Sequence, residues 1–332
     1  MYEKILITGA SGFLGGRVVE GLRDYPAQLV ATGRNLERLK PLARFGAQLL
    51  PGDLSRRDQA LEVAASCDLI IHCAALSSPW GAYRDFYEAN VSATQNLLEA
   101  AKANRAKRFI LISTPSIYFN FKNRYQIKET DPLPYPMVNH YASTKWQAEQ
   151  TVLNAGLPAL ALRPRAIIGR GDTVIMPRVL HAYRENRLRI IGKGDNVVNV
   201  TPVANVVHAV RCGMEAGTAA LGRAYNITSG EDVRLWDLIL DMFQRLDLPF
   251  QAKNLPYPIA LSAAWLMEQY ARFVSGKEPA LTRYSVGILA QSMTMDIGLA
   301  QQYLGYTPIQ NAREGMEEFV QWWQQQPATQ TP

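Results

Sequence analysis

The chain of 332 residues has few cysteines and no pattern of metal ligands. Its three cysteines, Cys67, Cys73 and Cys212, form no C-x-x-C pair. The spacing therefore indicates neither a redox motif nor a zinc site, and we expect no metal. We expect the three residues to be buried free thiols in a reducing compartment.

Clustered charge is also missing. The net charge of +6 comes from 35 basic and 29 acidic residues, with no run of five or more like charges. A nucleic-acid surface is not expected from this pattern. The mildly basic balance suits a polyanionic cofactor.

Long apolar runs are absent as well. The nearest is Leu255 to Met267, LPYPIALSAAWLM, which is short for a membrane span and contains two prolines. The first residues enter a strand pattern directly, with no signal peptide. We expect a cytoplasmic protein without a transmembrane span, and leave open whether segment 255–273 touches a membrane.

The N-terminus carries the strongest positive signal. Lys4 to Leu22, KILITGASGFLGGRVVEGL, predicts an apolar strand, a glycine-rich turn and a helix. Gly9 allows the sharp exit from the strand, Gly12 lets the backbone approach a pyrophosphate, and Gly15 lets helix and strand pack closely. The helix N-terminus then favours phosphate binding. The loop would add three further cofactor contacts: Ser11, Phe13 and Leu14.

Strand and helix patterns continue to alternate, with strands expected at 28–32, 47–50, 69–72 and 108–112. This alternation predicts an α/β fold, a Rossmann doubly wound parallel sheet covered by helices on both faces. A dinucleotide-binding domain is expected over about 1–162, with a return at about 200–228. Residues 163–199 and 229–332 would form a smaller, mostly helical substrate-binding region.

Four helices are expected in that region, at 235–246, 259–273, 282–289 and 312–323, from their apolar spacing. The helix at 259–273 is rich in Leu, Ala, Trp and Met. We expect it to face the core. The alternative is an apolar lid over a greasy substrate.

The residues after the second strand bear on the choice of cofactor. No acid stands at the strand end, and Arg34 follows it at once, with Arg38 one helical turn later. An arginine here accommodates the 2′-phosphate of NADP, so the sequence favours NADP(H) over NAD(H). The alternative is that both arginines lie on a solvated helix face. After the fourth strand, the small Ala74 and Ala75 would let the backbone pass close to the cofactor, whereas His72 is expected to be a packed strand-end residue.

Tyr141 and Lys145 begin an amphipathic helical pattern. Residues four apart lie on one face of a helix. An ammonium group near a phenol lowers the phenol pKa, so Tyr141 would exchange a proton near neutral pH. A second pair with this spacing, Tyr118 and Lys122, follows a strand without a helical pattern, and we discard it as catalytic.

Thr114 ends the fifth strand, 27 residues before Tyr141. This arrangement behind a T-G-x-x-G-F-x-G loop resembles the extended short-chain dehydrogenase/reductase family over nearly the whole chain. The segment from Leu162 to Asp172, LRPRAIIGRGD, resembles the 3β-hydroxysteroid dehydrogenase-like branch. The resemblance implies that Tyr141 exchanges the proton, that Lys145 tunes it and holds the nicotinamide ribose, and that Thr114 orients the substrate oxygen. Ser113 and then Ser116 are the alternatives to Thr114.

The resemblance also implies further cofactor contacts. Asp53 and Leu54 would lie against the adenine, although a helix N-cap is the competing interpretation of Asp53. Asn90 would brace neighbouring backbone, and segment 163–169, with Pro164 and Ile167, would pass beside the nicotinamide. One departure is Phe119, which stands where the family often has glycine and would narrow the pocket.

The implied function is that of an NADP(H)-dependent oxidoreductase. It would transfer hydride between the nicotinamide and a carbonyl or secondary alcohol of an apolar small molecule, sterol-like or long-chain. Two alternatives stay open, a nucleotide-sugar epimerase of the same fold and a non-catalytic NADP-binding regulator. Dehydratase chemistry is disfavoured because Pro115-Ser116 replaces the Asp-Glu pair that it uses. The resemblance also implies a homodimer through the helices near 90–103 and 141–153.

Overall fold

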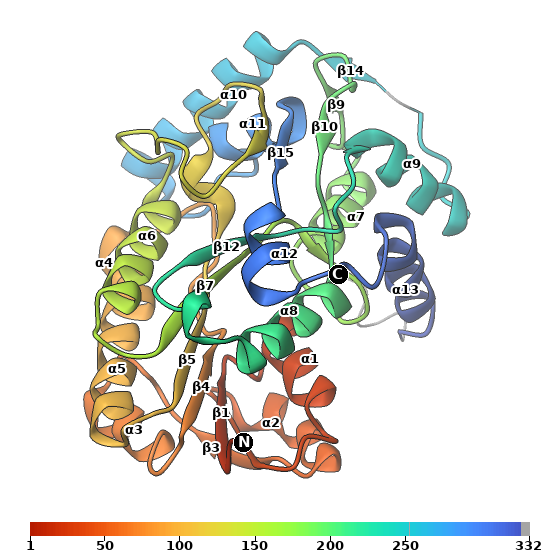
Figure 1. The fold of residues 1–332 in the computed structure, drawn as a ribbon. Coiled ribbons are helices and arrows are strands. Elements are labelled where there is room, and N and C mark those ends of the chain that lie inside the picture. Colours follow the sequence, from red (N-terminus) through yellow and green to blue (C-terminus); the bar gives the residue numbers. More distant parts are fainter. Residues whose placement is uncertain (252, 327–332) are drawn as a thin grey trace.

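The computed structural model describes residues 1–251 and 253–326. Its centre is a seven-stranded, fully parallel sheet in the order β12-β7-β5-β4-β1-β2-β3 (Figure 1). The strands are β1 (Lys4–Thr8), β2 (Gln28–Gly33), β3 (Gln48–Pro51), β4 (Leu69–His72), β5 (Arg108–Ile112), β7 (Ala159–Pro164) and β12 (Ala224–Ile227). The strand order reverses between β1 and β4, which is where doubly wound sheets bind nucleotides. The predicted Rossmann fold is confirmed.

Side chains of each strand alternate between two apolar layers, as the pleat of a strand requires. Ile5 and Ile7 of β1 belong to one buried cluster, and Leu6 between them belongs to the other. Helices α1 (Phe13–Gly21), α8 (Val203–Glu215) and α12 (Gly298–Leu304) cover the first layer. Helices α3 (Arg57–Val63), α5 (Ala93–Ala103) and α6 (His140–Leu153) cover the second. The sheet is thus buried on both faces.

Two short helices complete the first half of the chain. They are α2 (Leu36–Leu39) after β2 and α4 (Tyr83–Phe86) before α5. A π-helical turn over Tyr87–Ser92 joins α4 to α5. This turn carries Asn90, a predicted site residue, on the side of α6.

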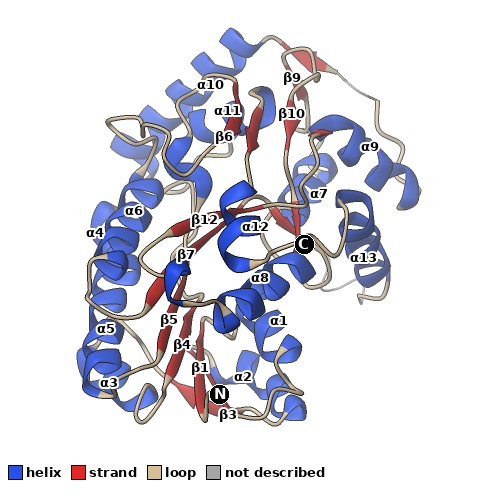
Figure 2. Cartoon of the chain, in the orientation of Figure 1, coloured by secondary structure: helices blue, strands red, loops and turns tan. Residues whose placement is uncertain are grey.

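The remaining helices lie mostly beyond the carboxyl ends of the central strands (Figures 1 and 2). They are α7 (Met176–Arg184), α9 (Leu235–Arg245), α10 (Tyr257–Tyr270), α11 (Arg283–Ala290) and α13 (Ala312–Gln324). The four helices predicted from apolar spacing are therefore present. At the start of α13, Asn311 and Glu314 form a capping box, which fixes where this helix begins.

Short strands tie this part together. A four-stranded sheet contains β13 (Val233–Arg234), β10 (Val197–Val198), β15 (Met293–Met295) and β6 (Arg124–Ile127). Two pairs are β11 (Thr201–Pro202) with β8 (Ile167–Ile168), and β14 (Asn254–Leu255) with β9 (Ile190–Ile191).

Helix α10 differs from its prediction. Only Ala260, Ala264 and Glu268 of this helix are buried, whereas Leu266 and Tyr270 are each 61% exposed. The expectation that this helix faces the core is wrong for its large side chains, because its small residues make the contact with α11. No helix among the described residues is both long and apolar enough to cross a membrane.

The three cysteines are free thiols, as expected. Only Cys67 is fully buried, and burial raises its pKa to about 11. Cys73 and Cys212 are partly exposed, so the expected burial holds for one of the three.

Candidate active site

The glycine loop between β1 and α1 has no room for side chains. Gly9 has a φ of +64°, and a Cβ there would lie 2.8 Å from the backbone of Ala74. A Cβ on Gly15 would lie 2.4 Å from the Gly9 carbonyl oxygen. Gly12 is the N-cap of α1 and provides no side-chain cap. The first N–H groups of α1 can therefore receive phosphate oxygens, and the loop fits a dinucleotide diphosphate.

The end of β2 carries two exposed arginines. Within residues 1–251 and 253–326, the side chains of Arg34 and Arg38 make no hydrogen bond or ion pair. Asn35 between them caps α2 by accepting from the Arg38 N–H. Both guanidinium groups are therefore available to a phosphate. Their exposure also fits the alternative interpretation, in which both arginines lie on a solvated helix face.

Asp53 follows β3 and holds a turn. Its carboxylate accepts hydrogen bonds from the Ser55 N–H, at 3.0 Å, and from the Ser55 hydroxyl, at 2.8 Å. The N-cap of α3 is Arg56. The interpretation of Asp53 as a helix N-cap is therefore wrong. Its contact with the adenine, like that of Leu54, stays a prediction.

Tyr141 and Thr114 meet at the carboxyl end of the sheet. Asn139 caps α6 by accepting from the Ala142 N–H at 2.8 Å, which places Tyr141 in the first turn. The Thr114 and Ser77 side chains lie close to the Tyr141 phenol and lower its pKa. Of the three candidate hydroxyls after β5, Thr114 is thus the one that acts on the tyrosine.

The two alternatives to Thr114 have other environments. The Ser113 hydroxyl is buried without a hydrogen-bond partner among the described residues. Ser116 accepts from the Thr114 hydroxyl at 3.1 Å and lies 2.8 Å from the hydroxyl of Tyr284 on α11. A row of hydroxyls therefore runs from Tyr141 through Thr114 and Ser116 to Tyr284.

Sequence reasoning missed Ser77 and Tyr284. A signal for Ser77 existed, because it lies in the loop after β4, and β4 pairs with β5. Loops that follow neighbouring parallel strands meet at the same edge. Tyr284 had no such signal, since it lies 168 residues after its partner Ser116.

Lys145 lies one helical turn after Tyr141 on α6, and its side chain points to the sheet. Its Nζ donates to the Ile112 carbonyl at 2.7 Å, and its side chain is buried. Burial lowers the pKa of this ammonium group to about 8, although the nearby Glu149 acts in the opposite direction. The lysine is thus held at the end of β5, where the resemblance implies a nicotinamide ribose.

The expected effect of Lys145 on the tyrosine is wrong in this structure. Burial raises the pKa of Tyr141, and the neighbouring Thr114 and Ser77 side chains offset only part of this rise. The Lys145 ammonium is directed to the Ile112 carbonyl. Tyr141 is consequently a protonated phenol at neutral pH.

Asn90 holds the loop after β4 in place. Its Oδ1 accepts from the Leu76 N–H at 2.7 Å, and its Nδ2 donates to Thr144 on α6 at 3.0 Å. The expected bracing role is present, and Ala74 and Ala75 belong to the braced loop. His72 is fully buried between the hydroxyls of Thr8 and Thr94, and burial lowers its pKa to about 3. It is a packed residue, as predicted.

Comparison with known proteins identifies the family. The model of the NAD dependent epimerase/dehydratase family matches residues 5–228. The chain belongs to this family. It is an NAD(P)-dependent enzyme of the extended short-chain dehydrogenase/reductase type.

Its curated relatives include a reductase and a dehydrogenase, and its fold is similar to that of an epimerase. The chain is 32% identical to a 2-alkyl-3-oxoalkanoate reductase of Stenotrophomonas maltophilia, over 94% of this chain and 97% of that protein. It is 28% identical to the mouse sterol-4-alpha-carboxylate 3-dehydrogenase, decarboxylating, over 96% and 90%. Its fold matches UDP-glucuronic acid 4-epimerase of Bacillus cereus with a TM-score of 0.75 and 22% identity, covering 97% of this chain and 99% of that one.

Of the discarded pair Tyr118 and Lys122, the tyrosine has a structural role. The Tyr118 hydroxyl donates to Asn226 at 3.0 Å and receives a hydrogen bond from Arg163, while Lys122 is exposed. Burial raises the Tyr118 pKa to about 12. Arg163 also pairs with Glu149 inside the molecule. This network holds β7 to α6 and has no catalytic role.

Phe119 packs against α11, and its expected narrowing of the substrate pocket stays a prediction. It is buried, and its ring packs edge-on against Tyr284, with centroids 5.6 Å apart. It therefore supports α11 from below. Pro164 pairs with Ile227 at the carboxyl end of the sheet, and Ile167 begins β8. The contacts of Pro164 and Ile167 with nicotinamide stay predictions.

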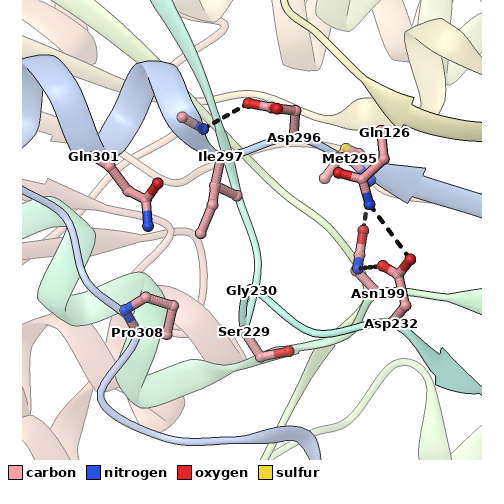
Figure 3. Close-up of a pocket in the computed structure, with 11 residues that line it drawn as sticks. Gln126, Asn199, Ser229, Gly230, Asp232, Met295, Asp296, Ile297, Gln301 and Pro308 are labelled. Carbon is pink, nitrogen blue, oxygen red and sulfur yellow. Dashed lines mark hydrogen bonds between the residues drawn. The ribbon is translucent and has the colours of Figure 1, made fainter.

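A polar pocket of about 470 Å³ lies apart from these residues (Figure 3). Figure 3 shows Asn199 bonded to Asp232 and to Met295. The lining residues are Gln126, Asn199, Ser229, Gly230, Asp232, Met295, Asp296, Ile297, Gly298, Gln301 and Pro308. None of them is a predicted site residue, and its polar groups are largely bonded to one another. We therefore place the active site at the carboxyl end of β5.

Proposed function

We propose that this protein is an NADP(H)-dependent reductase or dehydrogenase acting on a carbonyl or secondary alcohol of an apolar small molecule. The observation that carries the proposal is the arrangement at the end of β5, behind the glycine loop, where Lys145 donates to the Ile112 carbonyl and Tyr141 lies close to Thr114. A non-catalytic regulator has no use for this arrangement together with a buried Lys145.

The side chains have separate tasks in this chemistry. When bound, the nicotinamide supplies or receives the hydride. Tyr141, protonated at neutral pH, donates its proton to the carbonyl oxygen, and Thr114 holds that oxygen by a hydrogen bond. The positive charge of Lys145 beside the end of β5 favours the negative charge that develops there.

An apolar substrate is supported by the segments that surround the hydroxyls. The ring of Tyr284 lies beside Ser116 and is backed by the buried ring of Phe119. Glu268 of α10 binds the backbone N–H and the guanidinium of Arg283 on α11, so α10 and α11 form one unit above the site. The names of two oxidoreductase relatives, a 2-alkyl-3-oxoalkanoate reductase and a sterol-4-alpha-carboxylate 3-dehydrogenase, describe substrates with apolar carbon skeletons.

The preference for NADP(H) is supported by Arg34, whose side chain has no partner in the part of the chain that the structure describes. The Arg34→Ala variant is expected to weaken NADPH binding about 10- to 100-fold and to leave NADH binding unchanged, because only NADPH carries a 2′-phosphate. Titration by cofactor fluorescence measures both. Arg84→Ala, which removes an exposed arginine paired with Glu88, is the control. Equal weakening of both cofactors would contradict the phosphate role.

Nucleotide-sugar epimerisation is the second candidate, because the fold matches an epimerase over nearly its whole length. The Tyr141→Phe variant tests the site for either chemistry. We expect it to lower kcat about 10²- to 10⁴-fold with NADPH still bound. Tyr125→Phe, at an exposed tyrosine, is the matched control. Wild-type rates in the Tyr141→Phe variant would contradict the assignment of Tyr141 as the catalytic residue.

A further inference from the structure

Arg165 is a buried cation without a counter-charge. It directly follows β7, and only 6% of it is exposed. Its main chain is anchored, because its N–H donates to the Ile227 carbonyl and its own carbonyl accepts from Thr201. Its guanidinium makes no hydrogen bond or ion pair with any residue the structure describes, and its Nε is buried without a partner.

The contrast with Arg163, two residues earlier, shows that Arg165 lacks a carboxylate partner. Arg163 is equally buried but is bound by Glu149 and by the Tyr118 hydroxyl. Buried charges in proteins are normally paired in this way, because removal from water is unfavourable. Loss of water lowers the pKa of Arg165 to about 10, and the nearby Tyr284 offsets only part of this. Arg165 is still positively charged at neutral pH, and the protein leaves that charge unbalanced.

The position of this charge connects it with the catalytic hydroxyls. Strand β7, which Arg165 follows, pairs with β5, which Thr114 follows. Arg165 also acts electrostatically on the Tyr284 phenol. Tyr284 in turn bonds Ser116, which bonds Thr114. The unbalanced cation therefore lies beside the row of hydroxyls at which the substrate oxygen is held.

We propose that Arg165 binds a carboxylate of the substrate close to the reacting carbon, so that the substrate class is an apolar 3-oxo or 3-hydroxy acid. The planar guanidinium matches a carboxylate with two parallel hydrogen bonds. This inference rests on the proposed function and adds the residue that selects the substrate.

The test is a binding measurement on the enzyme loaded with NADPH. A long-chain 3-hydroxy acid and its methyl ester are titrated separately, since reduced cofactor and reduced ligand cannot react. We expect the acid to bind about 100-fold more tightly than the ester. Arg165→Gln is expected to abolish this difference while keeping the affinities for the ester and for NADPH. Arg245→Gln, which removes an arginine paired with Asp241, is the control and should keep the difference.

Three outcomes would overturn the inference. The first is equal affinity of the wild-type enzyme for acid and ester, which requires no variant. The second is weaker NADPH binding in Arg165→Gln, which would assign the guanidinium to the cofactor. The third is a loss of UDP-sugar binding in that variant, which would make the anion a phosphate. Should Arg165→Gln not fold, Arg165→Lys replaces it. We expect this variant to weaken acid binding about tenfold, because the two parallel hydrogen bonds are lost, and to leave ester binding unchanged; an unchanged acid-to-ester ratio there would contradict the inference.

Turnover of the corresponding 3-oxo methyl ester separates the inference from the proposed function. The ester lacks the carboxylate, so its reduction depends on Tyr141 and the cofactor alone. Ester reduction without a preference for the acid would refute the role of Arg165 and keep the reductase. Absence of reduction with either compound would refute the reductase and, with it, the inference.

Discussion

Tyr141 and Lys145 share one face of α6, yet burial moves their pKa values in opposite directions. The phenol pKa is raised and the ammonium pKa is lowered to about 8, because each group loses the solvation of its charged form. The tyrosine is therefore a proton donor at neutral pH, while the lysine is close to losing its charge.

The first prediction concerns pH. Lys145 carries its positive charge below a pKa of about 8 and loses it as the pH rises through that value. We expect kcat/KM for ketone reduction to fall above about pH 8 for this reason. Initial rates between pH 6 and 10 check this, with circular dichroism at each pH as the control for unfolding. A rate that increases from pH 8 to 9 would contradict the role of the charged lysine.

The second prediction concerns the buried pair Arg163–Glu149, whose side chains are 4% and 0% exposed. Glu149→Gln leaves a buried guanidinium uncompensated, so we expect a loss of about 3–5 kcal/mol in the free energy of unfolding. Urea denaturation measures it. Glu88→Gln, which breaks an exposed pair with Arg84, should change stability by less than about 0.5 kcal/mol. Similar losses in both variants would refute the argument.

At this scale the sequence predicted residue types better than contacts. The Tyr141 and Lys145 pair followed from helical spacing, but three hydroxyls after β5 remained candidates for the partner. Which of Ser113, Thr114 and Ser116 lies closest in effect to Tyr141 depends on the turn that follows the strand, where Thr114 accepts from the Ser116 N–H. Such a turn is fixed by tertiary contacts that spacing does not encode.

The elements of the first half follow from local chemistry. The glycines of the first turn are required by close packing, because α1 approaches β1 within the reach of a single methyl group. Alternating apolar residues in β1 predict a strand buried on both faces, as observed. For α10 the pattern predicted a helix but did not show that Ala260, Ala264 and Glu268 would be its buried residues.

The third prediction concerns the junction of β1 and α1. Gly15→Ala would place a Cβ 2.4 Å from the Gly9 carbonyl oxygen, so the helix must shift. We expect a loss of about 1–3 kcal/mol in stability and weaker NADPH binding. Thermal unfolding and fluorescence titration measure the two effects. Gly217→Ala is the control, since its φ is −69° and no atom lies within 4 Å of the added Cβ. A stable variant with normal NADPH affinity would contradict the packing argument.

The topology of the whole molecule brings the loops of the site to one edge of the sheet. The sheet order reverses between β1 and β4, so the loops after β1, β4, β5 and β7 open at one edge. The alternation of strands and helices made this edge predictable. The position of α11 at this edge was not predictable, because Tyr284 contacts Ser116 across 168 residues of chain.

The central claim is net hydride transfer to an apolar ketone, and the most direct test is the stoichiometry of NADPH consumption. The purified enzyme is mixed with NADPH and either a long-chain 3-oxo compound or a UDP-sugar. The account predicts one NADPH oxidised for each ketone reduced, with no oxidation and no interconversion in the UDP-sugar sample. Interconversion of the UDP-sugar without consumption of NADPH, together with an unreacted ketone, would contradict it and establish an epimerase.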